Sequence, residues 1–284
     1  MRWKSTRVIL FALITIFVFW FVKFCLSFPN ADVEIVGIIL TISSILFGLL
    51  AGFFISELWS RYTEIRELQG VRSSEEVNMI RYAKHFLPNR KFEREFKLGV
   101  EKASISDEVI NWDEGHLEAP YFQDIEDSFK YVKVKNRKDN VYFDTLLESY
   151  NSLTKSIVRL DVLYKERLFL SEWIILFVLS LVIAVSILFL DASHFFSKII
   201  IIVFPAIIAL ALSIVYDLDR LTWGRELITL EPTQRVFDAI GVKRFYLKKD
   251  RKFVSKDVKD YRTEDDLKGD LKKVYLKIIS SRKK

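Results

Sequence analysis

The sequence predicts an all-α, polytopic membrane protein with four transmembrane helices and long cytoplasmic helical extensions. Hydrophobic residues make up 51% of the 284 residues and charged residues 28%, yet the apolar residues are gathered into blocks. Four blocks lack any charge: 8–22, 35–56, 173–190 and 199–216. Each is close to the roughly 20 residues that a helix needs to cross the hydrocarbon core. The blocks show no alternation of apolar and polar residues, so they do not fit membrane β-strands.

Two other interpretations of these blocks are less favourable. The blocks could be buried core helices of a soluble protein, but four uncharged stretches of this length in one chain disfavour that. The first block could instead be a cleaved signal peptide. The residues before Cys25 are not small, and no A-x-A cleavage site follows. We therefore expect the first block to remain as a span over about residues 8–27.

The first hairpin comprises residues 1–56, with spans at about 8–27 and 35–56 joined by a short turn. The second turn holds one lysine, Lys198, whereas cationic residues gather at the outer ends of both hairpins. They are Arg2, Lys4, Arg7, Arg61, Arg66, Arg72, Lys155, Arg159, Lys165, Arg167, Arg220 and Arg225. Because positive residues accumulate on the cytoplasmic side, this pattern places both termini and residues 57–172 in the cytoplasm. The sequence thus predicts a multi-pass protein of the inner cell membrane.

Residues 57–172 form the predicted cytoplasmic helical region. Residues 57–86 continue the second span as a helix, and residues 90–102 form another. The stretch 104–140 has the least regular pattern. Residues 141–170 have apolar side chains at helical spacing, and we expect this helix to run directly into the third span.

The second hairpin comprises residues 173–216, with spans 173–190 and 199–216, and a basic C-terminal tail follows over residues 217–284. Pro232 and Gly241 are expected to bracket a short helix. Residues 242–284 contain 16 Lys or Arg against 7 Asp or Glu. A last helix starts after Thr263 and has an apolar face made of Leu267, Leu271, Val274, Tyr275 and Ile278. This tail either binds anionic lipid headgroups or packs on the cytoplasmic helices, and the second interpretation is favoured.

The second span carries small residues at every fourth position: Ser44, Gly48, Gly52 and Ser56. Such a ridge lets another helix approach closely, and close packing is what holds helices together in lipid. The ridge therefore predicts that this span lies inside the helix bundle or at an interface between subunits.

Beside the ridge, Ile45, Leu49 and Phe53 also recur every four residues. Apolar residues at helical spacing usually serve ordinary packing. The alternative is an apolar constriction, which gates a channel by dewetting when several copies surround one axis. One four-helix chain is too thin for a pore, so this alternative requires a ring of identical subunits.

The stretch LFGLLAGFFISELWSRYTEI resembles the second membrane helix of the bestrophin family, including its prokaryotic relatives. The shared features are the Gly52-Phe53-Phe54 step, Ser56, and then Trp59, Arg61 and Tyr62. The four-span layout with a long insert between the second and third spans matches as well. The resemblance implies a homopentameric anion channel whose second helix lines a narrow neck. By position, the neck residues would be Ile45, Leu49 and Phe53.

The chain departs from the family pattern at identifiable places. Leu49 stands where the family usually has Phe, and the Trp-Arg-Tyr cluster comes about one helical turn early. No dense acidic run follows the fourth span, and Asp217 and Asp219 are too few for the calcium site of the animal proteins.

Other classes of function lack support in the sequence. No phosphate-binding loop, dinucleotide-binding glycine pattern or nucleophile elbow occurs, so we expect no enzyme and no cofactor. His85, His116 and His194 are far apart, so we expect no metal site. No charged residue lies deep in a block, which disfavours a coupled transporter. No nucleic-acid-binding module accompanies the basic tail.

Two functions are consistent with these features of the sequence. The first is a homo-oligomeric anion channel in the lipid bilayer, with the apolar neck on the second span and with Arg61 and Arg66 lining a cytoplasmic vestibule. The alternative is a non-conducting membrane scaffold or regulator that binds a cytoplasmic partner or anionic lipid.

Overall fold

The computed structural model describes residues 14–18, 20–23, 25, 33–109, 120–190, 195–221, 225–248, 254, 258 and 260–281. Its main helices are α2 (Val33–Ala83), α3 (Arg90–Val109), α4 (Pro120–Phe129), α5 (Arg137–Lys165), α6 (Leu170–Phe189), α7 (Phe195–Asp219), α8 (Arg225–Ile240) and α9 (Gly269–Ser281). Two short strands, β1 (Arg244–Phe245) and β2 (Tyr261–Arg262), pair in parallel. The predicted all-α class is confirmed.

The chain divides into two compact units. Unit 1 comprises Met1–Tyr62 and Arg167–Trp223, and unit 2 comprises Thr63–Glu166 and Gly224–Lys284. The long helix α2 contributes its first part to unit 1 and its second part to unit 2. As predicted, the helix of the second span continues without a break past residue 57, and a 3-10 turn (Lys84–Phe86) follows it.

Three helical stretches are long and apolar enough to cross a membrane: Glu34–Phe86, Arg137–Phe189 and Ile199–Asp219. They contain the second, third and fourth predicted spans. Of the first predicted span, a shorter apolar helix, Ile14–Lys23, is seen. The rest of that span and most of both hairpin turns lie outside the described residues.

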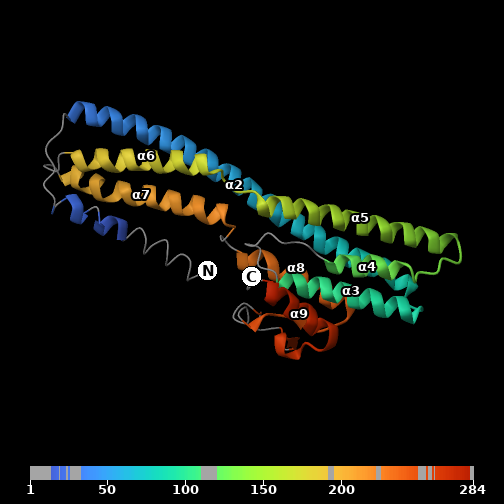
Figure 1. Ribbon diagram of the computed structural model, residues 1–284. Coiled ribbons are helices and arrows are strands. Elements are labelled where there is room, and N and C mark those ends of the chain that lie inside the picture. Colours follow the sequence, from blue (N-terminus) through green and yellow to red (C-terminus); the bar gives the residue numbers. More distant parts are fainter. Residues whose placement is uncertain are drawn as a thin grey trace. The chain divides into compact units, whose positions relative to one another are not determined.

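Unit 1 is a helix bundle in which α6 and α7 run beside the first part of α2 (Figure 1). Phe47 and Phe54 of α2 are buried against apolar side chains such as Leu176 of α6 and Ile208 of α7. Lys23, near the end of the first block, donates from Nζ to the carbonyls of Leu188 and Leu190 at 2.6 and 2.8 Å. It thereby satisfies acceptors that the end of α6 leaves open.

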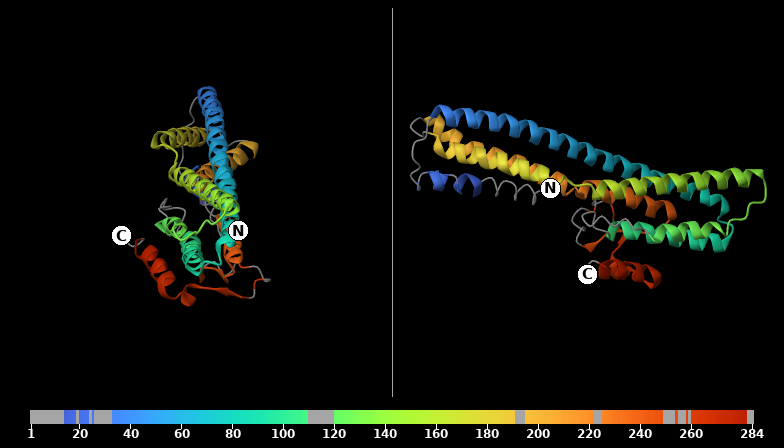
Figure 2. Two further views of the ribbon diagram at one scale, coloured as in Figure 1. Left: turned by 90° about the vertical axis from the view of Figure 1, so that its right-hand side faces the viewer. Right: turned by 45° about the horizontal axis from the view of Figure 1, so that its top comes forward.

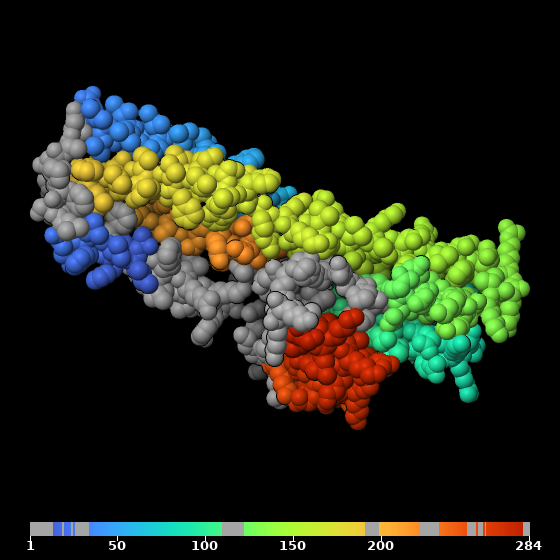
Figure 3. Space-filling view, viewed as in Figure 1, coloured from blue at the N-terminus to red at the C-terminus, as the bar shows by residue number. Residues whose placement is uncertain are grey.

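The outer face of α6 remains apolar. Its side chains form a continuous part of the surface seen in Figure 3, and Ile174, Phe177 and Leu181 are 52%, 56% and 63% exposed. A soluble protein rarely leaves so long a row of large apolar side chains uncovered. Lipid chains cover such a face in a membrane, which agrees with the apolar spans.

Unit 2 has its own core, built from the second part of α2 together with α3, α4, α5, α8 and α9. The helices α3 and α4 lie side by side (Figures 1 and 2) and approach each other closely at Gly99. A Cβ atom at Gly99 would lie 3.1 Å from the Ile125 nitrogen and 3.2 Å from the Asp124 carbonyl carbon. The glycine is therefore what lets the two backbones approach.

The basic tail packs on this core. Leu267, Val274 and Ile278 are buried, and Leu271 and Tyr275 pack beside them. The apolar face expected from the sequence is thus used for packing, which was the favoured interpretation.

The predicted bounds of α8 are correct at one end only. Gly241, with a φ of +76°, ends α8 as predicted. The predicted start at Pro232 is wrong, because the helix begins at Arg225 and Pro232 lies inside it.

The expectation of an unbroken helix from residue 141 into the third span is also wrong. The helix α5 begins earlier, after an Asn136 cap, and ends at Lys165. Residues 166–169 are not helical, and α6 starts at Leu170 with the Glu172 carboxylate accepting from the Phe169 amide at 2.7 Å. The stretch 104–140 is more helical than expected, since α3 extends to Val109 and α4 follows.

Candidate functional site

The exposed face of α2 in unit 1 is the candidate functional site. Ile45, Leu49 and Phe53 are 58%, 67% and 63% exposed, whereas Phe47 and Phe54 are buried in the bundle. At 3.6 residues per turn, positions 45, 49 and 53 follow one another along a single face of the helix. The three residues predicted to form the neck therefore lie together, on the side of α2 that the described part of the protomer does not cover.

The ridge of small residues lies beside this apolar row. Gly48, Gly52 and Ser56 are exposed and Ser44 is half-buried. A Cβ atom added at Gly48 or Gly52 would meet nothing within 4 Å. At Gly48 and Gly52 the ridge therefore leaves room beside the described helices of its own chain. Both predicted positions of this span, the interior of the bundle and an interface between subunits, remain proposals.

Arg61 does not lie where the sequence predicted. It is 8% exposed, and its Nη2 donates to the carbonyl oxygens of Leu218 and Asp219 at 3.2 and 2.7 Å. The Asp219 carboxylate lies 4.0 Å from its Nη1. A buried charge needs hydrogen bonds, and these carbonyls accept them. Arg61 therefore fastens α2 to the end of α7 instead of lining a vestibule.

Asp219 joins a third segment to this contact. Its Oδ1 accepts from the amide of Leu168 at 2.8 Å, in the non-helical stretch before α6. A carboxylate that accepts this amide holds the chain out of the helix there, which explains why α5 and α6 are separate. From the sequence, Asp219 was noted only as one of two acids after the fourth span. No signal in the sequence pairs Asp219 with Arg61 or with Leu168, which lie far away along the chain.

Arg66, the second predicted vestibule residue, lies on the part of α2 that belongs to unit 2. Its side chain is exposed. It remains a candidate for a vestibule surface.

Unit 2 contains a buried group of charges that the sequence did not predict. Arg72 contacts the Asp107 carboxylate and donates to Glu76 Oε1 at 3.2 Å, and its guanidinium carbon lies 5.3 Å from the centre of the Phe122 ring. All three charged side chains are 5–6% exposed. Burial raises the pKa of Glu76, and the charge of Arg72 opposes that rise. These residues tie α2 to α3, outside the apolar spans.

His85 and Asp139 form a second polar contact, at the start of α5. His85 Nε2 lies 2.9 Å from Asp139 Oδ1, and the His85 ring stacks on Tyr142 at 4.2 Å. Asp139 also accepts from the Lys135 amide at 2.9 Å. The hydrogen bond with His85, followed by that amide, lowers the pKa of Asp139. Among the described residues no group of three His, Cys, Asp or Glu side chains could hold a metal ion, and His116 and His194 lie outside them.

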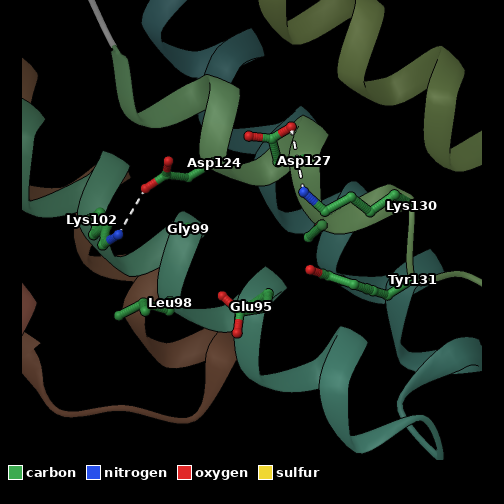
Figure 4. Close-up of a pocket in the computed structure, with 9 residues that line it drawn as sticks. Glu95, Leu98, Gly99, Lys102, Asp124, Asp127, Lys130 and Tyr131 are labelled. Atoms are coloured by element: carbon green, nitrogen blue, oxygen red, sulfur yellow. Dashed lines mark hydrogen bonds and ion pairs between the residues drawn. The ribbon is translucent and has the colours of Figure 1, made fainter.

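A small polar cavity of about 180 Å³ lies between α3 and α4 (Figure 4). Lys102 and Asp124 form an ion pair of 2.8 Å at its edge, and Lys130 and Asp127 one of 3.9 Å. The opposite charges at this cavity therefore pair with each other.

Together, the apolar spans, the lipid-facing side of α6 and the uncovered face of α2 define a helical membrane protein. The family model described as a bestrophin-like domain matches residues 9–221. The chain therefore belongs to the bestrophin-like family.

Solved structures share this fold. A bacterial bestrophin homologue from Klebsiella pneumoniae is 12% identical, with a TM-score of 0.56 over 84% of this chain and 97% of that one. A single-residue variant of that homologue gives a TM-score of 0.57 at 12% identity over 83% and 97%. A variant of a membrane protein gives 0.58 at 12% identity over 84% and 97%. No match was found among curated proteins.

Proposed function

We propose that this chain is a subunit of a homo-oligomeric channel for small anions. Copies of α2 surround one axis, and Ile45, Leu49 and Phe53 of each copy form an apolar neck. The number of copies is five if the assembly follows the bestrophins that the sequence resembles.

The exposure of the α2 face carries this proposal. The row from Ile45 to Phe53 is not covered by the described part of its own chain, and the small residues beside it leave room for a neighbouring helix. A ring of such helices would bury the small ridge between subunits and leave the apolar row on the axis. An apolar constriction of this kind conducts when it is wetted and closes when it dries.

The flanking charges support an orientation for the channel. Cationic residues lie at the outer ends of the hairpins, so both termini and unit 2 would face the cytoplasm in the cell membrane. Arg66, exposed on α2 in unit 2, would then contribute positive charge to the cytoplasmic entrance. Arg61 has no part in that entrance, because it is buried.

The test is chloride flux from liposomes that contain the purified oligomer. We predict measurable flux from the wild type, and a rise of roughly 2- to 10-fold in Phe53→Ala because a smaller side chain widens and wets the neck. Phe177→Ala is the matched control: Phe177 is 56% exposed on α6, on the surface assigned to lipid. The control should conduct like the wild type.

Absence of flux from a verified oligomer would contradict the channel, and equal effects of the two substitutions would contradict the assigned neck.

The competing function is a scaffold that binds a partner or anionic lipid. It is favoured by the outer side of α9, where Leu276 is 53% exposed among Lys272, Lys273 and Lys277. A stable monomer in mild detergent, combined with binding to anionic vesicles, would support the scaffold.

A further inference from the structure

The contacts of Arg61 bear on how α2 keeps its apolar row facing outward. The neighbouring buried residues on its packed side in unit 1, such as Phe47, Phe54 and Leu58, are apolar. Dispersion contacts of this kind have little directional preference, and no hydrophobic effect holds helices together inside lipid. Packing of this kind holds α2 against its neighbours, and a hydrogen-bonded contact adds a directional constraint on its rotation and on sliding along its axis.

Arg61 supplies that directional contact. Its guanidinium donates to two successive main-chain carbonyls, those of Leu218 and Asp219, at 3.2 and 2.7 Å. A planar guanidinium with donors in a fixed fork constrains both distance and orientation. The acceptors are the last carbonyls of α7, where the helix leaves its final carbonyls open to other donors, and that of Leu218 also accepts from the Leu221 amide at 3.1 Å. The contact therefore fixes a point of α2 against a defined end of another helix.

The position of Arg61 along α2 connects this contact to the neck. Arg61 follows Leu49 by twelve residues, which places its side chain roughly 120° around the helix from Leu49. It follows Phe53 by eight residues, about 12 Å along the axis. Because one rigid helix carries both features, the angle at which Arg61 is held sets the direction in which Leu49 and Phe53 point.

We infer that Arg61 is a positioning residue: its hydrogen bonds to the α7 carbonyls set the rotation of α2 and so keep Ile45, Leu49 and Phe53 on the uncovered face. The effect of Arg61 on the rotation of α2 does not depend on the proposed function. Only the effect of that rotation on a pore rests on it. The main-chain carbonyls, more than the Asp219 carboxylate at 4.0 Å, hold the guanidinium. The carboxylate instead receives the Leu168 amide.

The test places a nitroxide spin label at each position from 45 to 54, on a Cys25→Ser background, in protein reconstituted into liposomes. Collision with oxygen and with a polar nickel complex reports how accessible each label is. In the wild type we expect maxima at 45, 49 and 53 and minima at 47, 51 and 54. Arg61→Met should shift this pattern or reduce its amplitude at least about twofold, since the two carbonyl contacts are lost.

Three further variants sharpen the result. Arg61→Lys keeps the positive charge but lacks the planar, forked donors of the guanidinium. We therefore expect the amplitude of the accessibility pattern to fall between those of the wild type and Arg61→Met. Asp219→Asn should keep the pattern, because the carbonyl of residue 219 remains. Arg66→Met is the control for the accessibility pattern, since Arg66 is exposed and should not affect it. A merely structural arginine would lower the yield of folded protein without changing the pattern in the protein that folds.

An unchanged pattern in Arg61→Met would overturn the inference. If that variant does not fold, an unchanged pattern in Arg61→Lys would do the same. The outcome is separate from that of the channel proposal. If the labels at 45, 49 and 53 collide with oxygen but not with the nickel complex, the apolar row faces lipid, which would contradict the channel. The comparison of Arg61→Met with the wild type would still test what sets the rotation of α2.

Discussion

At the residue scale, the Asp139 carboxylate shows how a single polar group fastens one element. It accepts from the Lys135 amide and lies against His85, so it holds the start of α5 close to the end of α2. These hydrogen bonds lower its pKa. A carboxyl group whose pKa is lowered in the folded state stabilises the fold at any pH above its ordinary pKa, here 3.8. This contribution is lost as the pH falls through the pKa of the folded state.

We therefore predict that Asp139→Asn lowers the melting temperature at neutral pH and that the difference from the wild type shrinks as the pH falls below 3.8. Melting curves of the detergent-solubilised protein across a pH series would measure this. Glu148→Gln, also on α5 but exposed, is the matched control and should change little at any pH. A difference that grew toward acid pH would show that the carboxylate is not stabilised in this way.

The surroundings of a single residue could be predicted from the sequence where helical spacing determines them, but not where a distant partner does. Ile45, Leu49 and Phe53 were placed on one face because helical spacing alone determines that. Arg61 was expected to line a vestibule, and Arg72 was predicted only as one of the cationic residues on the cytoplasmic side. Their burial depends on acceptors that come from far along the chain, the α7 carbonyls and Asp107. Sequence spacing carries no information about such partners.

At the element scale, the crossing of α3 and α4 depends on one glycine, while another glycine in α2 has no such role. We predict that Gly99→Ala destabilises the protein by about 1–3 kcal/mol, because the new Cβ atom would press on the backbone of α4. Gly70→Ala provides the opposite case: nothing lies within 4 Å of a Cβ atom there, and alanine favours the helix by about 0.5–1 kcal/mol. In thermal unfolding, Gly99→Ala should therefore lower the melting temperature and Gly70→Ala should raise it.

Destabilisation by Gly70→Ala would contradict the open surroundings of Gly70, and unchanged stability in Gly99→Ala would contradict the close contact between α3 and α4. At this scale the sequence was a good guide to α2, α3 and the apolar faces of α6, α7 and α9, since these follow from periodicity and length. It was a poor guide to the interruption between α5 and α6. That interruption is held by the Asp219 carboxylate, 51 residues after Leu168, and local propensity favours a continuous helix.

At the scale of the whole molecule, two units share the helix α2, and the proposed function depends on several copies of the chain. The described part of each protomer leaves the α2 row uncovered, together with Gly48, Gly52 and Ser56 of the small ridge. The sequence could predict that such a ridge needs a partner helix, but not which one, because both a bundle and an interface satisfy the same packing rule. In the structure, no atom of the described residues lies within 4 Å of a Cβ atom added at Gly48 or Gly52, and the choice between the bundle and an interface remains a proposal.

Whether copies of α2 surround one axis can be decided by the mass of the purified protein in mild detergent, measured by light scattering with the bound detergent subtracted. We predict a complex of several copies of the 33.4 kDa chain, five if it follows the bestrophins. A single chain has no room for a neck between copies of α2. A stable particle with the mass of one chain would therefore contradict the proposed ring.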